Sequence, residues 1–143
     1  MIKIIEVNSQ DDFEKCLDIR TKVFIEEQNV PLELEMDGYD CDALHLLLFY
    51  ENIPCATLRV LFPSKDTAHV GRVCVLKEYR RHHLGTALIT HLEKILKESK
   101  IKHIELGAQY YIKCFYEKLG YKCDGDIFMD ANIEHIMMKK DID

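Results

Sequence analysis

The chain has 143 residues, of which 48% are apolar and 31% are charged. This length suffices for one buried core but not for two ordinary domains, so we expect a single domain over residues 1–143. The net charge of −6 argues against a general nucleic-acid or anionic-membrane surface, because both of these partners are polyanions.

The hydrophobic pattern at the start of the chain and the spacing of the cysteines indicate the cellular compartment of the protein. The first residues alternate and then turn acidic, without the apolar segment of a signal peptide, and the longest apolar run, at residues 44–50, is too short to span a bilayer. The six cysteines show no CxxC spacing and mostly have apolar neighbours, so we interpret them as small core residues. Neither a metal site nor a disulfide framework is predicted, and a reduced, cytoplasmic protein is expected.

Apolar periodicity and turn signals predict strands and helices along the whole chain. Ser9 followed by Asp12 is typical of a capping box at a helix start. In chain order the predicted elements are a strand at 2–7, a helix from 9 to about 26, strands at 43–50, 55–62 and 68–76, a helix from 84, a strand at 101–106, a helix at 111–119, and strands near 121–128 and 134–139. Residues 27–42 are expected to form a loop with one short helix at most. Hairpins followed by βαβ crossovers indicate an α/β fold with a mixed sheet of about six or seven strands and helices on both faces.

The segment at residues 73–88, VCVLKEYRRHHLGTAL, joins a buried strand, a basic turn and a helix start. A helix N-terminus has unpaired backbone N–H groups and the positive end of the helix dipole, so a basic turn before it makes an anion site. Gly85 and Ala87 are small and let backbone amides approach phosphate oxygens closely. The pattern predicts a diphosphate-binding turn; a basic turn that merely caps a core helix is the alternative.

This segment resembles the signature (Arg or Gln)-x-x-Gly-x-(Gly or Ala) of the Gcn5-related N-acetyltransferase (GNAT) superfamily, with Arg80 in the first position and Gly85 in the last. His83 stands where the signature has its middle glycine. Residues 104–109 (IELGAQ) and 115–121 (FYEKLGY) resemble the second signature of the family, in which a strand diverges from its neighbour and opens a slot for pantetheine. Residues 23–31, 42–46, 72–75 and 131–136 match the small ElaA/YjcF-like group in order, with departures at Gly107 and Ile112.

The resemblance implies an enzyme that transfers acetyl from acetyl-CoA to the primary amine of a small molecule by direct transfer. In this family a tyrosine faces the thioester sulfur and a main-chain amide polarises the carbonyl, which implies these roles for Tyr116 and for the N–H of Val75. The implied coenzyme A site consists of Val73, Cys74, Val75, Arg80, Arg81, His82, His83, Leu84, Gly85, Thr86, Ala87, Gln109, Phe115 and Tyr116.

Three side chains compete for the general base that takes the proton of the amine. His135 matches a position where relatives carry a catalytic histidine, His45 lies inside an apolar strand, and Glu27 lies in the loop after the first helix. Imidazole suits this role at neutral pH. We favour His135 and also assign His45 to the acceptor site; for each of the three, a structural or solvated side chain is the alternative.

Arg20 and Arg72 lie next to apolar segments, where arginine is costly without a partner. If both reach the acceptor cleft, they would hold a carboxylate or phosphate of the substrate, which slightly favours an acidic amine over a polyamine. The alternative is that each arginine pairs with an Asp or Glu.

The sequence also bears on three other functions. A non-catalytic acyl-CoA-binding protein and a protein acetyltransferase acting on a lysine or an N-terminus are both compatible with the motifs. A cleft walled by residues 27–42 would favour a small acceptor over a protein. An unrelated nucleotide-binding module is disfavoured, because the chain has neither GxGxxG nor a P-loop. A monomer and a homodimer are equally compatible.

Overall fold

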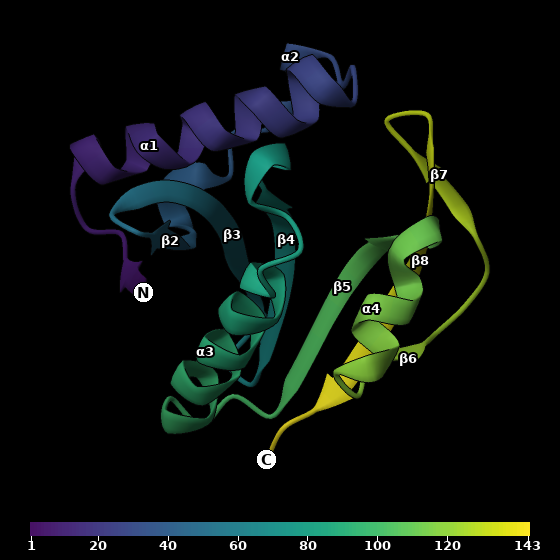
Figure 1. Cartoon of the computed structure of the whole chain (residues 1–143). Coiled ribbons are helices and arrows are strands. Elements are labelled where there is room, and N and C mark those ends of the chain that lie inside the picture. Colours follow the sequence, from purple (N-terminus) through teal and green to yellow (C-terminus); the bar gives the residue numbers. More distant parts are fainter.

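Eight strands form a single mixed sheet in the order β1-β2-β3-β4-β5-β8-β6, with β7 paired to β8. The computed structural model describes residues 1–143 and is drawn in Figure 1. The strands are β1 (Ile2–Glu6), β2 (Leu44–Tyr50), β3 (Ile53–Ser64), β4 (Thr67–Val75), β5 (His103–Gln109), β6 (Lys122–Cys123), β7 (Phe128–Asp130) and β8 (Ile133–Asp141). All neighbours are antiparallel except β4 and β5, which are parallel.

The predicted mixed sheet is confirmed, but it has more strands than the six or seven expected. The single strand predicted near residues 121–128 is divided into β6 and β7. Gly125, between them, has φ +102 and lies between Asp124 and Asp126, a composition that favours turns over extended backbone.

Four α-helices accompany the sheet: α1 (Gln10–Arg20), α2 (Leu32–Glu35), α3 (Leu84–Glu98) and α4 (Lys113–Lys118). The predicted cap of α1 is confirmed, because the Ser9 hydroxyl oxygen accepts the N–H of Asp12 at 3.2 Å. Beyond α1 the backbone continues as a π-helical segment, η1 (Thr21–Glu27), where an ordinary helix to about residue 26 was predicted. Widened turns of this kind are frequent at functional sites. None of the helices combines the length and the apolar character needed to cross a bilayer.

The alternation of side chains along β2 separates two hydrophobic clusters. Leu46 and Leu48 belong to the larger cluster, together with the buried residues of α3 and with Tyr116 of α4. Leu47 belongs to the smaller cluster, with Cys16 of α1. Successive strand residues point to opposite faces of a sheet, so α3 and α4 cover one face, which we call the α3 face, and α1 covers the other, the α1 face (Figure 1).

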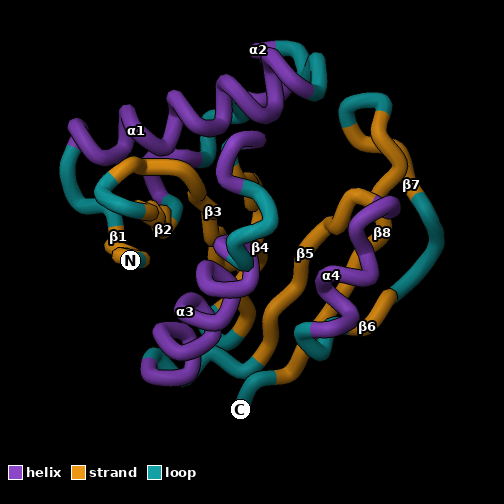
Figure 2. Tube along the Cα trace, in the orientation of Figure 1, coloured by secondary structure: helices purple, strands orange, loops and turns teal.

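The parallel strands β4 and β5 pair over only part of their length. Their register runs from Thr67 beside His103 to Val70 beside Leu106 and stops there, although both strands continue. Figure 2 shows them together near the end of α3 and spread apart toward α2 and β7. The divergence implied by the second signature is therefore confirmed.

A β-bulge changes the face to which the side chains of β4 point. The register with β3 shifts by one residue between Gly71 and Cys74, and Arg72 within the bulge has φ +52, a conformation that is unusual for a residue with a side chain. Val70, before the bulge, packs in the cluster of the α3 face, whereas Cys74, after it, packs in that of the α1 face. The extra residue thereby turns Arg72 away from the apolar core of the α3 face.

Candidate active site

A cavity of about 870 Å³ lies where β4 and β5 part. Most of the residues predicted to bind coenzyme A line it: Val73, Cys74, Val75, Arg80, Arg81, His83, Leu84, Gly85, Thr86, Gln109, Phe115 and Tyr116. The other two do not. The ring of His82 lies against that of Tyr50, with centroids 4.9 Å apart, and Ala87 packs against the core of the α3 face.

The start of α3 leaves three backbone amides available at this cavity. The first hydrogen bond of the helix runs from the N–H of Ala87 to the carbonyl of His83, at 3.1 Å, and no side chain caps the helix. The N–H groups of Leu84, Gly85 and Thr86 therefore have no acceptor in the helix. All three residues line the cavity, so the positive end of a 15-residue helix is directed at it.

Gly85 lies in close contact with a second helix. A Cβ at this position would lie 3.1 Å from the ring of Phe115 on α4, which is closer than ordinary van der Waals contact. The absent side chain lets α4 pack directly against the start of α3 and keeps Phe115 in the cavity wall. The sequence alone predicted the small residue but not this contact.

Glu27 and Arg80 form an ion pair joined by two hydrogen bonds, of 2.7 Å and 2.8 Å. Arg80 also donates from Nε to the carbonyl of Val75 at 3.0 Å. The hydrogen bond from Arg80 lowers the pKa of Glu27, and Glu27 does not line the cavity. Its carboxylate thus orients Arg80, and this placement disfavours Glu27 as the general base.

The backbone N–H of Val75 faces the space that β5 has left. Leu76 donates its N–H to the carbonyl of Cys55 at 2.8 Å, and Val75 is paired with Ala56 of β3. Hydrogen-bonded and non-hydrogen-bonded pairs alternate along an antiparallel ladder, so the pair next to Leu76 and Cys55 is not hydrogen-bonded. The N–H of Val75 therefore points away from β3, toward the cleft.

Tyr116 and Cys74 are both nearly buried in the cavity wall, with 4% and 5% of their surface exposed. Burial raises the pKa of the Tyr116 phenol, so the hydroxyl is in its protonated form at neutral pH and can act as a hydrogen-bond donor. Burial also raises the pKa of the Cys74 thiol. Because the thiolate is the reactive form of cysteine, Cys74 is not an activated nucleophile.

His135 lies on β8 opposite Gln109 of β5, and it lines the cavity from the α1 face, because its neighbour Ile136 belongs to the core of the α3 face. Its Nδ1 is 2.7 Å from the carbonyl oxygen of Ile133. A carbonyl can only accept, so Nδ1 donates its hydrogen to it, and in the neutral ring Nε2 is the nitrogen that carries the lone pair. The ring lies against Phe128, with centroids 5.8 Å apart. His135 and Tyr116 therefore reach the cavity from opposite faces of the sheet.

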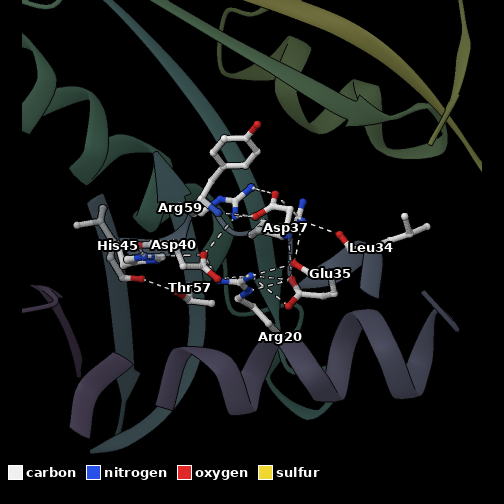
Figure 3. Close-up of polar contacts among 11 residues, drawn as sticks. Arg20, Leu34, Glu35, Asp37, Asp40, His45, Thr57 and Arg59 are labelled. Atoms are coloured by element: carbon white, nitrogen blue, oxygen red, sulfur yellow. Dashed lines mark hydrogen bonds and ion pairs between the residues drawn. The ribbon is translucent and has the colours of Figure 1, made fainter. Parts of the chain in front are cut away.

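Arg20 and Arg72 both belong to a closed ring in which three arginines and three carboxylates alternate. Figure 3 labels Arg20, Glu35, Asp37, Asp40 and Arg59 of this ring. We call these six residues the ion-pair ring. The successive contacts are Arg20–Glu35 (2.9 Å), Glu35–Arg72 (2.8 Å), Arg72–Asp37 (3.1 Å), Asp37–Arg59 (2.8 Å), Arg59–Asp40 (3.2 Å) and Asp40–Arg20 (2.8 Å). The ring joins α1, β3 and the bulge of β4 to the loop that carries α2.

Two side chains predicted at the acceptor do not reach it. Arg20 is 1% exposed and His45 is 5% exposed, and neither lines the cavity. The Nε2 of His45 is instead 3.0 Å from the carbonyl oxygen of Asp40, and burial lowers the pKa of this histidine. The prediction of direct substrate contact is corrected for both: Arg20 takes the alternative of pairing with acidic residues, and His45 takes that of a structural residue.

Sequence reasoning missed several residues of the site. Arg59 lies between the buried Leu58 and Val60 in β3, and a lone arginine within an apolar strand is the signal that could have revealed the ion-pair ring. Gln28 also lines the cavity and accepts a hydrogen bond of 2.9 Å from Gln109, which links the end of η1 to β5. No group of three or more His, Cys, Asp or Glu side chains is arranged to hold a metal ion.

The mixed sheet has two parallel strands that part beside a helix N-terminus, and free backbone groups face the gap. This arrangement defines the class of acyl-CoA N-acyltransferases. The family model for the acetyltransferase (GNAT) domain matches residues 19–142, so this chain belongs to the GNAT family and is an acyltransferase. It is 36% identical to YyaT of Bacillus subtilis, over 99% of this chain and 97% of YyaT. It is 30% identical to the N-acetyltransferase YjcF of the same organism, over 98% of this chain and 100% of YjcF.

Among solved structures, that of Escherichia coli ElaA matches with a TM-score of 0.87 and 26% identity, over 98% of this chain and 99% of ElaA. The predicted relationship with the ElaA/YjcF-like group is confirmed by these similarities.

Proposed function

We propose that this enzyme transfers acetyl from acetyl-CoA to the primary amine of a small molecule by direct transfer, in the cleft between β4 and β5. The observation that carries the proposal is the convergence of three groups on one cavity: the outward N–H of Val75, the protonated Tyr116 of the α3 face and the free Nε2 of His135 on the α1 face. Direct acyl transfer needs these three functions: a donor to the carbonyl oxygen, an acid for the leaving sulfur and a base for the amine.

The start of α3 is the proposed binding site for the acetyl donor. Its three unpaired amides and the neighbouring Arg81 fit the diphosphate of coenzyme A, because both the helix dipole and the basic side chain favour an anion there. An aminoglycoside 6'-N-acetyltransferase, solved in complex with coenzyme A, has the same fold, with a TM-score of 0.77 at 18% identity over 99% of this chain and 97% of that one. Its bound coenzyme supports this assignment. Acetyl-CoA supplies the acetyl thioester, and the chain supplies the groups around it.

In the proposed reaction the amine nitrogen forms a bond to the acetyl carbon, and the bond from that carbon to sulfur breaks. His135 Nε2 accepts the proton that leaves the nitrogen. The N–H of Val75 donates to the acetyl oxygen as negative charge develops on it, and the hydroxyl of Tyr116 gives its proton to the departing sulfur. Exchange with solvent returns both side chains to their starting states.

Two observations support this form of the reaction over its alternatives. The raised pKa of Cys74 disfavours an acetylated cysteine as a carrier. The ion-pair ring holds Glu35 and Asp37 in the cavity wall, so the loop of residues 27–42 forms a wall on the acceptor side, which favours a small molecule over a protein segment.

The test measures the release of free coenzyme A from acetyl-CoA with a panel of amines. We expect His135→Ala to lower kcat by about a hundredfold or more, and Tyr116→Phe to lower it as well. His103→Ala is the matched control, because His103 is exposed and does not line the cavity. Release at the wild-type rate by His135→Ala would remove the assigned base, and no release with any amine would overturn the proposed function.

A further inference from the structure

We infer that the acceptor is a primary amine with an apolar body and without a carboxylate or phosphate. The inference rests on the proposed function and concerns the α1 face of the cavity, the side that holds His135. It reverses the slight preference for an acidic amine that Arg20 and Arg72 suggested from the sequence. The charges of the cavity wall and its exposed apolar side chains support this inference independently.

The arginine in the acceptor wall is already neutralised by two carboxylates. Arg72 is the ring arginine that lines the cavity, and it donates to Glu35 at 2.8 Å and to Asp37 at 3.1 Å. Both carboxylates line the cavity too. The ring as a whole carries equal numbers of positive and negative charges, so an anionic group placed against Arg72 would also meet two carboxylates, whose repulsion offsets the attraction.

The remaining charged residues of the wall also disfavour an anionic acceptor. Arg80 is paired with Glu27, and Arg81 lies at the start of α3, where the diphosphate is proposed. His69 of β4 is 3.6 Å from the carboxylate of Glu105. Asp130 at the end of β7 lines the cavity without an ion pair. The one uncompensated formal charge on the acceptor side is therefore negative, and it favours an ammonium group over an anion.

The wall of the cavity that contains His135 also has an apolar surface. Leu34 of α2 and Phe128 of β7 line the cavity from its two sides, with 52% and 38% of their surface exposed. The ring of Phe128 lies over Gly107, where a Cβ would be 3.5 Å away. Phe24 and Met137 extend this wall. An apolar substrate body would remove these side chains from water, which a purely polar amine cannot do.

The direct test compares kcat/KM for amines that differ only in the carboxylate: 2-phenylethylamine against phenylalanine, and tyramine against tyrosine. We expect the amine without the carboxylate to be preferred by about tenfold or more, and 2-phenylethylamine to be preferred over ethanolamine. Equal or better use of the amino acids, or of ethanolamine, would overturn the inference. Release with amino acids alone overturns this inference but not the proposed function, whereas no release with any amine overturns both.

Two variants test whether the carboxylates beside Arg72 and the apolar side chains of the wall cause this preference. Asp37→Asn removes one carboxylate beside Arg72, so the preference for 2-phenylethylamine over phenylalanine should fall several-fold. This ratio of kcat/KM values does not depend on the folded fraction of the preparation.

Leu34→Ser should lower kcat/KM for 2-phenylethylamine several-fold and leave kcat/KM for ethanolamine unchanged. Leu32→Ser is the control, since Leu32 is 59% exposed on the same helix and outside the cavity. An unchanged ratio in Asp37→Asn, or equal effects of the two leucine variants, would contradict the argument.

Discussion

The side chains of Arg20 at the end of α1 and Glu35 in α2 are joined by two hydrogen bonds, of 2.9 Å from Nε and 3.1 Å from a terminal nitrogen. Only 1% and 3% of these two side chains are exposed. Burial alone would lower the pKa of Arg20, but the hydrogen bond to Asp40 and the charge of Glu35 outweigh it and raise the pKa. The pair attaches the acceptor loop to the helix that covers the α1 face.

Removing Glu35 should therefore destabilise the fold strongly. Glu35→Ala leaves Arg20 buried with reduced compensation and takes the main partner from Arg72, and the expected loss in free energy of unfolding is about 3–5 kcal/mol. Urea unfolding measures it. Glu33→Ala, on the exposed side of the same short helix, should change the free energy by less than about 0.5 kcal/mol. A loss below about 1 kcal/mol for Glu35→Ala would show that the ion-pair ring contributes little to stability.

Acid should weaken the same ring in a defined pH window. The hydrogen bond from Arg59 lowers the pKa of Asp37 from 3.8 to about 2. The unfolded chain thus binds this proton first as the pH falls, so the contribution of Asp37 to stability is complete above about pH 4 and is lost between pH 4 and pH 2. We expect a loss on the order of 1–2 kcal/mol from this group.

Urea unfolding at a series of pH values tests the window, with Asp37→Asn as the comparison. The variant should be less stable at neutral pH and should show a shallower decline between pH 4 and pH 2. Parallel curves for the two proteins would contradict the assignment to Asp37.

The parts of the fold that local sequence determines were predictable. Ser9 caps α1 because its hydroxyl needs only the N–H three residues later, and Glu51 and Asn52 form the tight turn between β2 and β3 with positive φ at both positions. Leu84 opens α3 at the start of a helical apolar repeat. Each of these features depends on neighbours within a few residues.

The features that depend on distant partners were not predictable from one sequence. Arg72 forms a hydrogen bond to Glu35, a residue 37 positions away in the sequence. The contact depends on the bulge in β4, which turns the Arg72 side chain toward that carboxylate. Without the bulge, strict alternation from Val70 would have placed Arg72 in the core of the α3 face. A sequence motif predicted the coenzyme site. The composition of the acceptor wall could not be predicted, because it depends on the face of the sheet to which each side chain points.

Glu27 should affect the binding of acetyl-CoA more than the chemical step. Its carboxylate holds Arg80, which in turn contacts the carbonyl of Val75, so Glu27→Gln should raise KM for acetyl-CoA several-fold and leave kcat within about twofold. Steady-state kinetics with acetyl-CoA as the varied substrate separates the two effects. A fall in kcat comparable to that of His135→Ala would instead identify Glu27 as the base.

Cys74 should be dispensable for acetyl transfer. Burial raises the pKa of its thiol, so little thiolate exists at neutral pH to accept an acetyl group. Cys74→Ala is expected to keep kcat within about threefold of wild type, with some loss of stability from the smaller side chain. Mass spectrometry of the wild-type protein mixed with acetyl-CoA and no amine should find no acetylated cysteine; stoichiometric acetylation at Cys74 would establish a two-step transfer.

Calorimetric titration with coenzyme A tests directly whether the backbone amides at the start of α3 hold the diphosphate of the coenzyme. We expect saturable binding of one coenzyme per chain. Thr86→Pro removes one of the three free amide donors without breaking a hydrogen bond within the helix, and should weaken binding by about tenfold. Thr86→Ala keeps the amide and should bind nearly as well as wild type. Absence of binding heat up to about 1 mM coenzyme A, or equal affinities for the two Thr86 variants, would contradict the account.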